Sequence, residues 1–91
     1  MNITDVRVKV VESESRLRGV ATITFDDAFV VHDIRIIEGE NGIFVAMPSK
    51  KTPNGTFRDI AHPIHADMRR MIEDAIVKAY NEVKDNPPVE E

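Results

Sequence analysis

Histidines and carboxylates gather between residues 59 and 67, and their types and spacing suggest either catalysis or metal binding. The group consists of Asp59, His62, His65 and Asp67. Asp59, His62 and His65 are each three residues apart, and on one helix this spacing could resemble a metal site. Pro63 argues against such a helix, because the residue before a proline avoids helical backbone angles. The chain also contains no Cys, no HExxH motif, no nucleophile elbow and no phosphate-binding glycine loop. We therefore expect no enzyme, no metal site, no cofactor and no small-molecule substrate.

A second group of side chains is basic and would bind anions. It consists of Lys50, Lys51, Arg58, Arg69 and Arg70. The segment Thr52-Pro53-Asn54-Gly55 predicts a tight turn, because proline presets φ at the second position and glycine can adopt the positive φ that closes a three-residue hairpin loop. The register of this hairpin pairs Thr52 with Thr56, Lys51 with Phe57, and Lys50 with Arg58.

The pairing of Lys50 with Arg58 favours a binding role for the hairpin. Like charges directly opposite each other destabilise a sheet by a few tenths of a kcal/mol to about 1 kcal/mol per pair. An anionic partner would relieve this repulsion. No carboxylate follows the two lysines before Asp59, and Thr52 adds an uncharged donor suited to phosphate oxygens.

Hydrophobic alternation predicts the strands that position these groups. Residues 3–11 and 19–25 each alternate between apolar and polar side chains, and residues 29–37 carry apolar side chains on both faces, which is typical of a central strand or of one at an interface. Asp26-Asp27 and Asn41-Gly42 provide tight turns between strands. With the apolar run 43–47 and the hairpin, we expect an antiparallel β-meander of about five strands.

From residue 64 the hydrophobic period changes to three and four, which predicts an amphipathic helix packed on the sheet. Its apolar face comprises Ile64, Met68, Met71, Ile72, Ala75, Ile76, Ala79, Tyr80 and Val83. Arg69 and Arg70 each precede an acidic residue by four positions, so ion pairing on the helix surface is as good an interpretation for them as anion binding. Residues 1–84 are predicted to form one α+β domain, and residues 85–91, with two prolines and two terminal glutamates, a disordered acidic tail.

Composition favours an oligomeric protein that does not span a membrane. The chain has 91 residues, no Trp, one Tyr and four Phe, so its core is thin, and the strand 29–37 offers apolar surface for a homodimer formed by antiparallel strand pairing. It shows no signal-peptide pattern and no apolar run near the roughly 20 residues that a membrane span needs. We expect a cytoplasmic protein.

The charges are unevenly distributed along the chain. The net charge is −4, but residues 41–72 hold five basic and two acidic side chains, whereas the segments before and after this one are both acidic. A basic third of a polar molecule can bind a polyanion locally. The plain alternative is a random scatter of charges on a small surface, and composition alone does not separate the two.

Two stretches of the chain, FVVHDIRIIEG-NG-FVAMPS and MPSKKTPNG-TFRDIAHPI, resemble the SpoVG-like (stage V sporulation protein G) family, also labelled septation proteins. The resemblance runs from about residue 3 to residue 80. It implies a small dimeric regulator of bacterial gene expression, linked to sporulation and septation, that binds DNA and in some cases RNA through the hairpin and the adjacent helix start.

The resemblance implies a binding role for the positions that match the family's pattern, which are Lys50, Lys51, Thr52, Arg58 and Arg69. Arg70 stands where a small residue is expected, so its role rests on its charge alone. The segment His65-Ala66-Asp67 also departs from the polar, uncharged residues expected there, and Asp67 places a negative charge beside the proposed site. The alternative function is a protein-interaction module that acts through a strand edge or the helix and binds nucleic acid only weakly.

Overall fold

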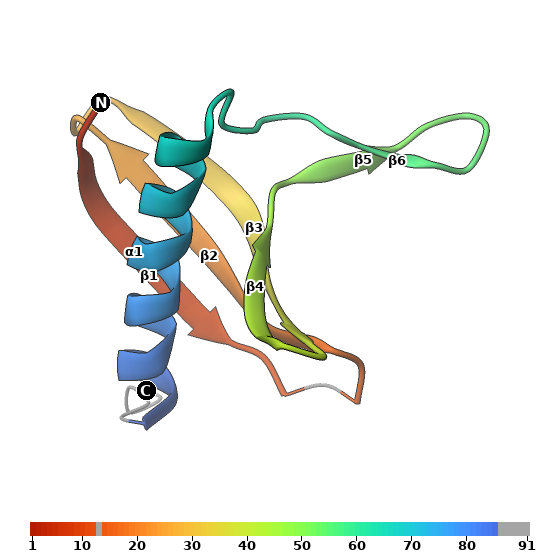
Figure 1. The fold of residues 1–91 in the computed structure, drawn as a ribbon, viewed down its shortest axis with the longest axis horizontal. Helices are drawn as coiled ribbons and strands as arrows, with labels where there is room; N and C mark the ends of the chain where they lie inside the picture. Colours follow the sequence, from red (N-terminus) through yellow and green to blue (C-terminus); the bar gives the residue numbers. More distant parts are fainter. Residues whose placement is uncertain (13, 86–91) are drawn as a thin grey trace.

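The computed structural model describes residues 1–12 and 14–85 and confirms the predicted α+β fold, with antiparallel strands followed by one C-terminal helix (Figure 1). The elements are β1 (Ile3–Val10), β2 (Leu17–Phe25), β3 (Phe29–Gly39), β4 (Gly42–Ala46), β5 (Ser49–Lys51), β6 (Phe57–Asp59) and α1 (Ala66–Asp85). Asp85, which the sequence assigned to the tail, is the last residue of α1. The rest of the predicted acidic tail, residues 86–91, lies outside the described residues.

The core lies between α1 and one face of a four-stranded sheet in the order β1-β2-β3-β4. Its buried members are Ala21, Ile23, Phe25, Ile34, Ile36, Val45, Met47, Ile72, Ile76 and Tyr80. The three helix residues among them are spaced by four, as the amphipathic pattern predicts. Two members of the predicted apolar face are exposed: Ile64 precedes the helix and is 88% exposed, and Met71 is about half exposed.

The predicted meander divides into two sheets after β4. Pro48 has no N–H to donate, so the strand that pairs with β3 ends before it. Within the described residues, β5 and β6 pair with each other and with no other strand. Their ladder extends to a hydrogen bond of 2.8 Å from the Ile60 N–H to the Pro48 carbonyl oxygen. We call residues 48–60 the arm, because this two-stranded ribbon projects away from the sheet and helix (Figure 1).

A β-bulge explains the apolar residues on both faces of β3. The register pairs Ala21 with Ile34 and Ile23 with Val31, so His32 and Asp33 share the space opposite a single residue of β2. Asp33 adopts the left-handed conformation, with φ of 62°. The extra residue shifts the alternation, so Val31 before the bulge and Ile34 after it both face the core. β3 is an interior strand, as predicted, and its apolar pattern combines this change of phase with Ile37, which lies on the face opposite the core.

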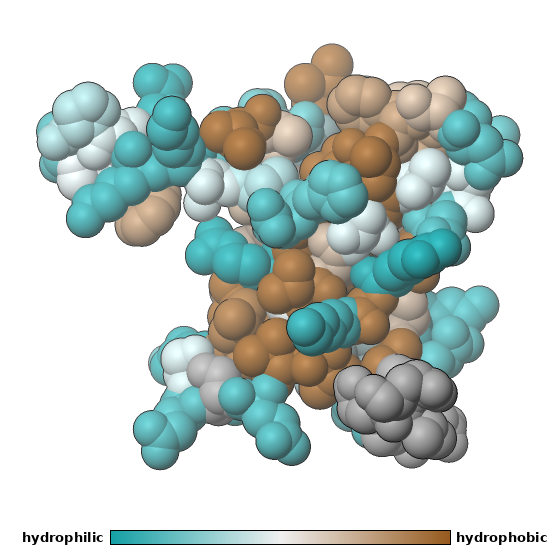
Figure 2. All heavy atoms as spheres, turned by 180° about the vertical axis from the view of Figure 1, so that it is seen from behind, coloured by the Kyte–Doolittle hydropathy of each residue, from teal (hydrophilic) through white to brown (hydrophobic). Residues whose placement is uncertain are grey.

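The face of the sheet opposite α1 carries apolar side chains and has no second layer over it in the described part of the chain. Register aligns Leu17 of β2 with Ile37 of β3 and Phe44 of β4 in one row across this face, and Val20 lies in the next row. We call these four residues the outer cluster. Figure 2, which views the molecule from behind, shows hydrophobic side chains gathered over the middle of this face. Phe44 is the most exposed of the four, at 47%.

Candidate nucleic-acid interface

The tip of the arm is a closed hairpin loop, as its sequence predicts. The Thr52 N–H donates to the Thr56 carbonyl oxygen at 2.6 Å, and the Gly55 N–H donates to the Thr52 carbonyl oxygen at 3.0 Å. Gly55 takes a φ of 88°, the positive value for which glycine is suited. The two threonine hydroxyls lie 2.7 Å apart and both contact the Asn54 side-chain oxygen. In this structure the Thr52 hydroxyl therefore holds the tip together, and its contact with phosphate stays a prediction.

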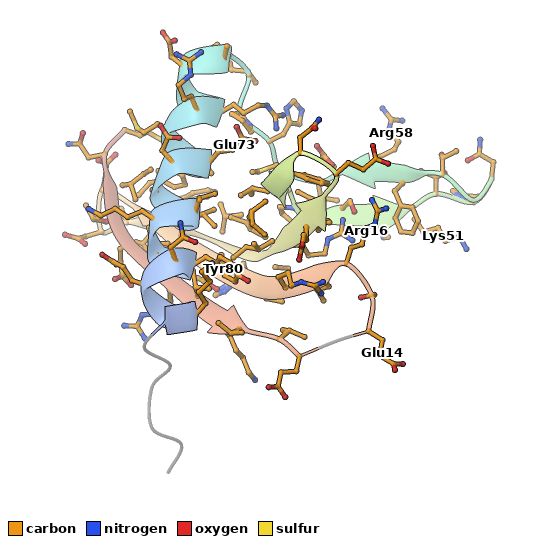
Figure 3. All side chains as sticks on the ribbon, turned by 60° about the horizontal axis from the view of Figure 1, so that its bottom comes forward. Glu14, Arg16, Lys51, Arg58, Glu73 and Tyr80 are labelled. Atoms are coloured by element: carbon orange, nitrogen blue, oxygen red, sulfur yellow. The ribbon has the colours of Figure 1, made fainter. Side chains whose placement is uncertain are left out.

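The register of the arm distributes its cations over both faces of the ribbon. Lys50 pairs with Arg58 and Lys51 pairs with Phe57, as predicted. Successive side chains of a strand point to opposite faces, so Lys50 and Arg58 share one face while Lys51 and Phe57 share the other. Figure 3 shows Lys51 and Arg58 on opposite sides of the ribbon. All four side chains are exposed.

The cations of the arm have no carboxylate partner in the part of the chain that the structure describes. Within the described residues, ion pairs join Arg7 to Asp5 at 2.9 Å and Arg18 to Glu38 at 2.7 Å, and no ion pair involves the arm. The nearest acid in sequence, Asp59, lies across from Ser49 at the base of the ribbon. The repulsion between the paired cations is thus not compensated by an ion pair among the described residues, which is the arrangement that an anionic ligand would relieve.

Arg35 adds a cation at the root of the arm that the sequence analysis did not single out. It lies on β3, half buried, and its Nη2 donates to the Ser49 hydroxyl oxygen at 3.2 Å. This contact links the sheet to the first residue of β5. The sequence gives a signal for it, because a lone arginine within an apolar strand needs a polar partner.

The basic residues of the helix are separate from those of the arm. Arg69 and Arg70 are exposed in the first two turns of α1, whereas the arm points away from the helix start (Figure 1). Neither arginine forms the predicted ion pair with the acidic residue four positions later. The structure therefore brings Lys50 and Arg58 together and leaves the two helix arginines on a second surface.

The histidines of the segment before α1 have local structural partners. The His65 Nδ1 accepts a hydrogen bond of 3.3 Å from the Met68 N–H, which caps the helix start. The His62 Nδ1 lies 3.0 Å from the Pro63 carbonyl oxygen. Across residues 1–12 and 14–85, no three His, Asp or Glu side chains are grouped so that they could hold a metal ion. In the same residues, no helix is long and apolar enough to cross a membrane.

An antiparallel sheet covered by one helix, with a basic ribbon projecting from it, defines a small α+β protein. Comparison with known sequences identifies its family. The profile of the SpoVG family matches residues 1–82, and the chain belongs to this family. It is 78% identical to the "Putative septation protein SpoVG" of Acholeplasma laidlawii over 93% of this chain and 90% of that protein. Proteins of the same name from Aster yellows witches'-broom phytoplasma and Staphylococcus aureus (strain MRSA252) are 60% and 53% identical, over 100% and 97% of this chain and 92% and 88% of theirs.

Proposed function

We propose that this protein is a cytoplasmic, homodimeric regulator of bacterial gene expression that binds DNA, and also RNA, through the arm, with residues 1–84 as its single domain. The observation that carries this proposal is the facing pair Lys50 and Arg58, exposed on a projecting ribbon and unpaired with any carboxylate in the described residues. The function needs no cofactor or metal and no catalytic step. The name of its relatives connects the regulated process with septation. The name of the family connects the same process with sporulation.

The shape of the arm suits a polyanionic ligand. A two-stranded ribbon is narrow enough to enter the major groove of DNA, and a ribbon with cations on both faces can contact the phosphates of either wall. Arg69 and Arg70 at the helix start provide a second set of contacts. Asp67, in the first turn of α1, reduces the positive potential there, so the arm contributes more of the affinity than the helix does.

Salt dependence of binding tests the proposal directly. If each arm of a dimer contacts phosphates through Lys50, Lys51 and Arg58, six contacts give a slope of log affinity against log salt of roughly −5 for duplex DNA. Fluorescence-anisotropy titration of a labelled duplex at several salt concentrations measures this slope. Absence of binding at low salt would reject the proposal. The protein-interaction module would then replace it, since an open β4 edge and the outer cluster also fit a protein partner.

We place the homodimer interface at β4, which is an edge strand beside the outer cluster. Pairing of β4 with its two-fold copy would extend the sheet and cover Phe44. The substitution Phe44→Glu would put a carboxylate into this interface, and we expect it to convert the dimer to monomer in light scattering at tens of micromolar. Val10→Glu, at the end of the opposite edge strand β1, is the matched control and should leave the dimer intact. A monomeric wild-type protein would refute the dimer itself.

A further inference from the structure

Phe57 is a largely exposed aromatic side chain on the arm. It lies on β6 of the arm, opposite Lys51, and is 67% exposed. Within the described residues, β5 and β6 pair with each other and with no other strand, and the arm projects away from the sheet and helix (Figure 1). Scattered apolar side chains are common on protein surfaces, but this one shares its face with a cation on the element that the proposed function assigns to nucleic acid.

The surroundings of Phe57 form a shallow hollow along β6. It has a volume of about 410 Å³ and is lined by Phe57, Arg58, Asp59 and His62. Its lining includes two aromatic residues, Phe57 and His62, of the kind that stacks on nucleobases. The Arg58 side chain points to the opposite face of the ribbon, so it is not part of this stacking surface. The lining also includes one carboxylate, and a carboxylate accepts hydrogen bonds from the amino groups of bases.

We propose, on the basis of the function proposed above, that this hollow binds an unpaired nucleobase and that the preferred ligand is therefore single-stranded nucleic acid. The base stacks on Phe57, and Lys51 on the same face neutralises a neighbouring phosphate. A duplex cannot use this site, because its bases already stack on one another and present only their edges in the grooves. Asp59 accepts a hydrogen bond from the amino group of cytosine, adenine or guanine, which thymine and uracil lack.

The test compares Phe57→Ala with Ile60→Ala on the same arm. Both residues are 67% exposed, but isoleucine has no π face. The probes are a fluorescent oligo-deoxycytidine of roughly ten nucleotides, a length in the range of single-strand sites, and a duplex of equal length. Stacking contributes on the order of 5- to 150-fold in affinity per base. We expect Phe57→Ala to lower the affinity for the single strand at least about 5-fold, and the affinity for the duplex by less than about twofold. Ile60→Ala should bind the single strand with the affinity of the wild type. Phe57→Trp should bind it with the same affinity or more tightly.

Several outcomes would overturn the inference. If Phe57→Ala weakens both probes equally, or neither, Phe57 does not stack on a base. If it converts the dimer to monomer, the ring belongs to a protein interface. If the wild type binds neither probe, the proposed function itself fails. If the wild type binds duplex with the expected salt slope but Phe57→Ala leaves single-strand binding unchanged, only the stacking site fails. Asp59→Leu, which removes both side-chain acceptor oxygens, should reduce the preference for oligo-deoxycytidine over oligo-deoxythymidine, and an unchanged preference would contradict the assigned hydrogen bond.

Discussion

Replacing Lys50 and Lys51 together with alanine is expected to flatten the salt dependence of duplex binding by a slope of roughly 3 to 4, because a dimer would lose four phosphate contacts of about 0.9 each. Near 0.1 M salt the same loss corresponds to an affinity decrease on the order of 10³-fold, for all sequences alike. Folding should scarcely change, because both side chains are exposed and removal of Lys50 relieves its repulsion with Arg58. Fluorescence anisotropy at several salt concentrations measures both effects.

The single substitutions separate the two faces of the arm. If a duplex contacts both faces, Lys50→Ala and Lys51→Ala each remove about half of the change in slope; if it lies against one face, a single substitution accounts for nearly all of it. An unchanged slope in the double variant would show that the arm is not the binding surface. Arg69→Ala is the comparison at the helix start. If that arginine contacts base edges, its loss should relax the preference between sites more than it lowers non-specific binding.

The substitution Ile76→Ala is expected to lower the free energy of unfolding by about 2 to 5 kcal/mol, because it leaves a cavity in the middle of the core. Ile76 is 0% exposed and is one of the four largest fully buried side chains among the described residues. For a domain of this length the total stability is on the order of 5 to 14 kcal/mol. The substitution should therefore lower the melting temperature by roughly 10 to 30 °C. Thermal unfolding followed by circular dichroism measures the shift.

Ile64→Ala is the matched control for the core substitution. Ile64 lies on the predicted apolar face of the same helix pattern, but it is 88% exposed in the structure. Removing its side chain should change stability by less than about 0.5 kcal/mol. Equal losses in the two variants would contradict the observed placement of the helix start, and would indicate that Ile64 is covered in the protein's assembled state.

The parts of this fold that depend on local chemistry could be predicted from the sequence. Pro53, Asn54 and Gly55 determine the loop of the arm, and the loop in turn determines which residues face each other across the ribbon. The repulsive pair at the centre of the candidate site follows from the same register. The helix could be predicted because its buried residues recur every four positions.

The remaining features depend on tertiary contacts that a periodic pattern does not contain. The bulge at His32 and Asp33 depends on the partner strand. The sequence does contain one signal for it: Asp33, a residue type that tolerates positive φ, stands between two apolar runs whose alternation is out of phase. The exposure of Ile64 depends on where the chain enters the helix. The contact of Arg35 with the root of the arm joins positions 14 residues apart, and no local rule predicts such a partner.

The separation of the arm from the core has a consequence for how this protein can evolve or be engineered. In most small domains the residues that bind a ligand also support the fold, so a gain in one property is often a loss in the other. Here the buried cluster draws on the sheet and the helix, and residues 48–60 contribute none of its members. Their charges and their one aromatic side chain, Phe57, can therefore be exchanged to retune ligand preference while the folding free energy stays almost constant.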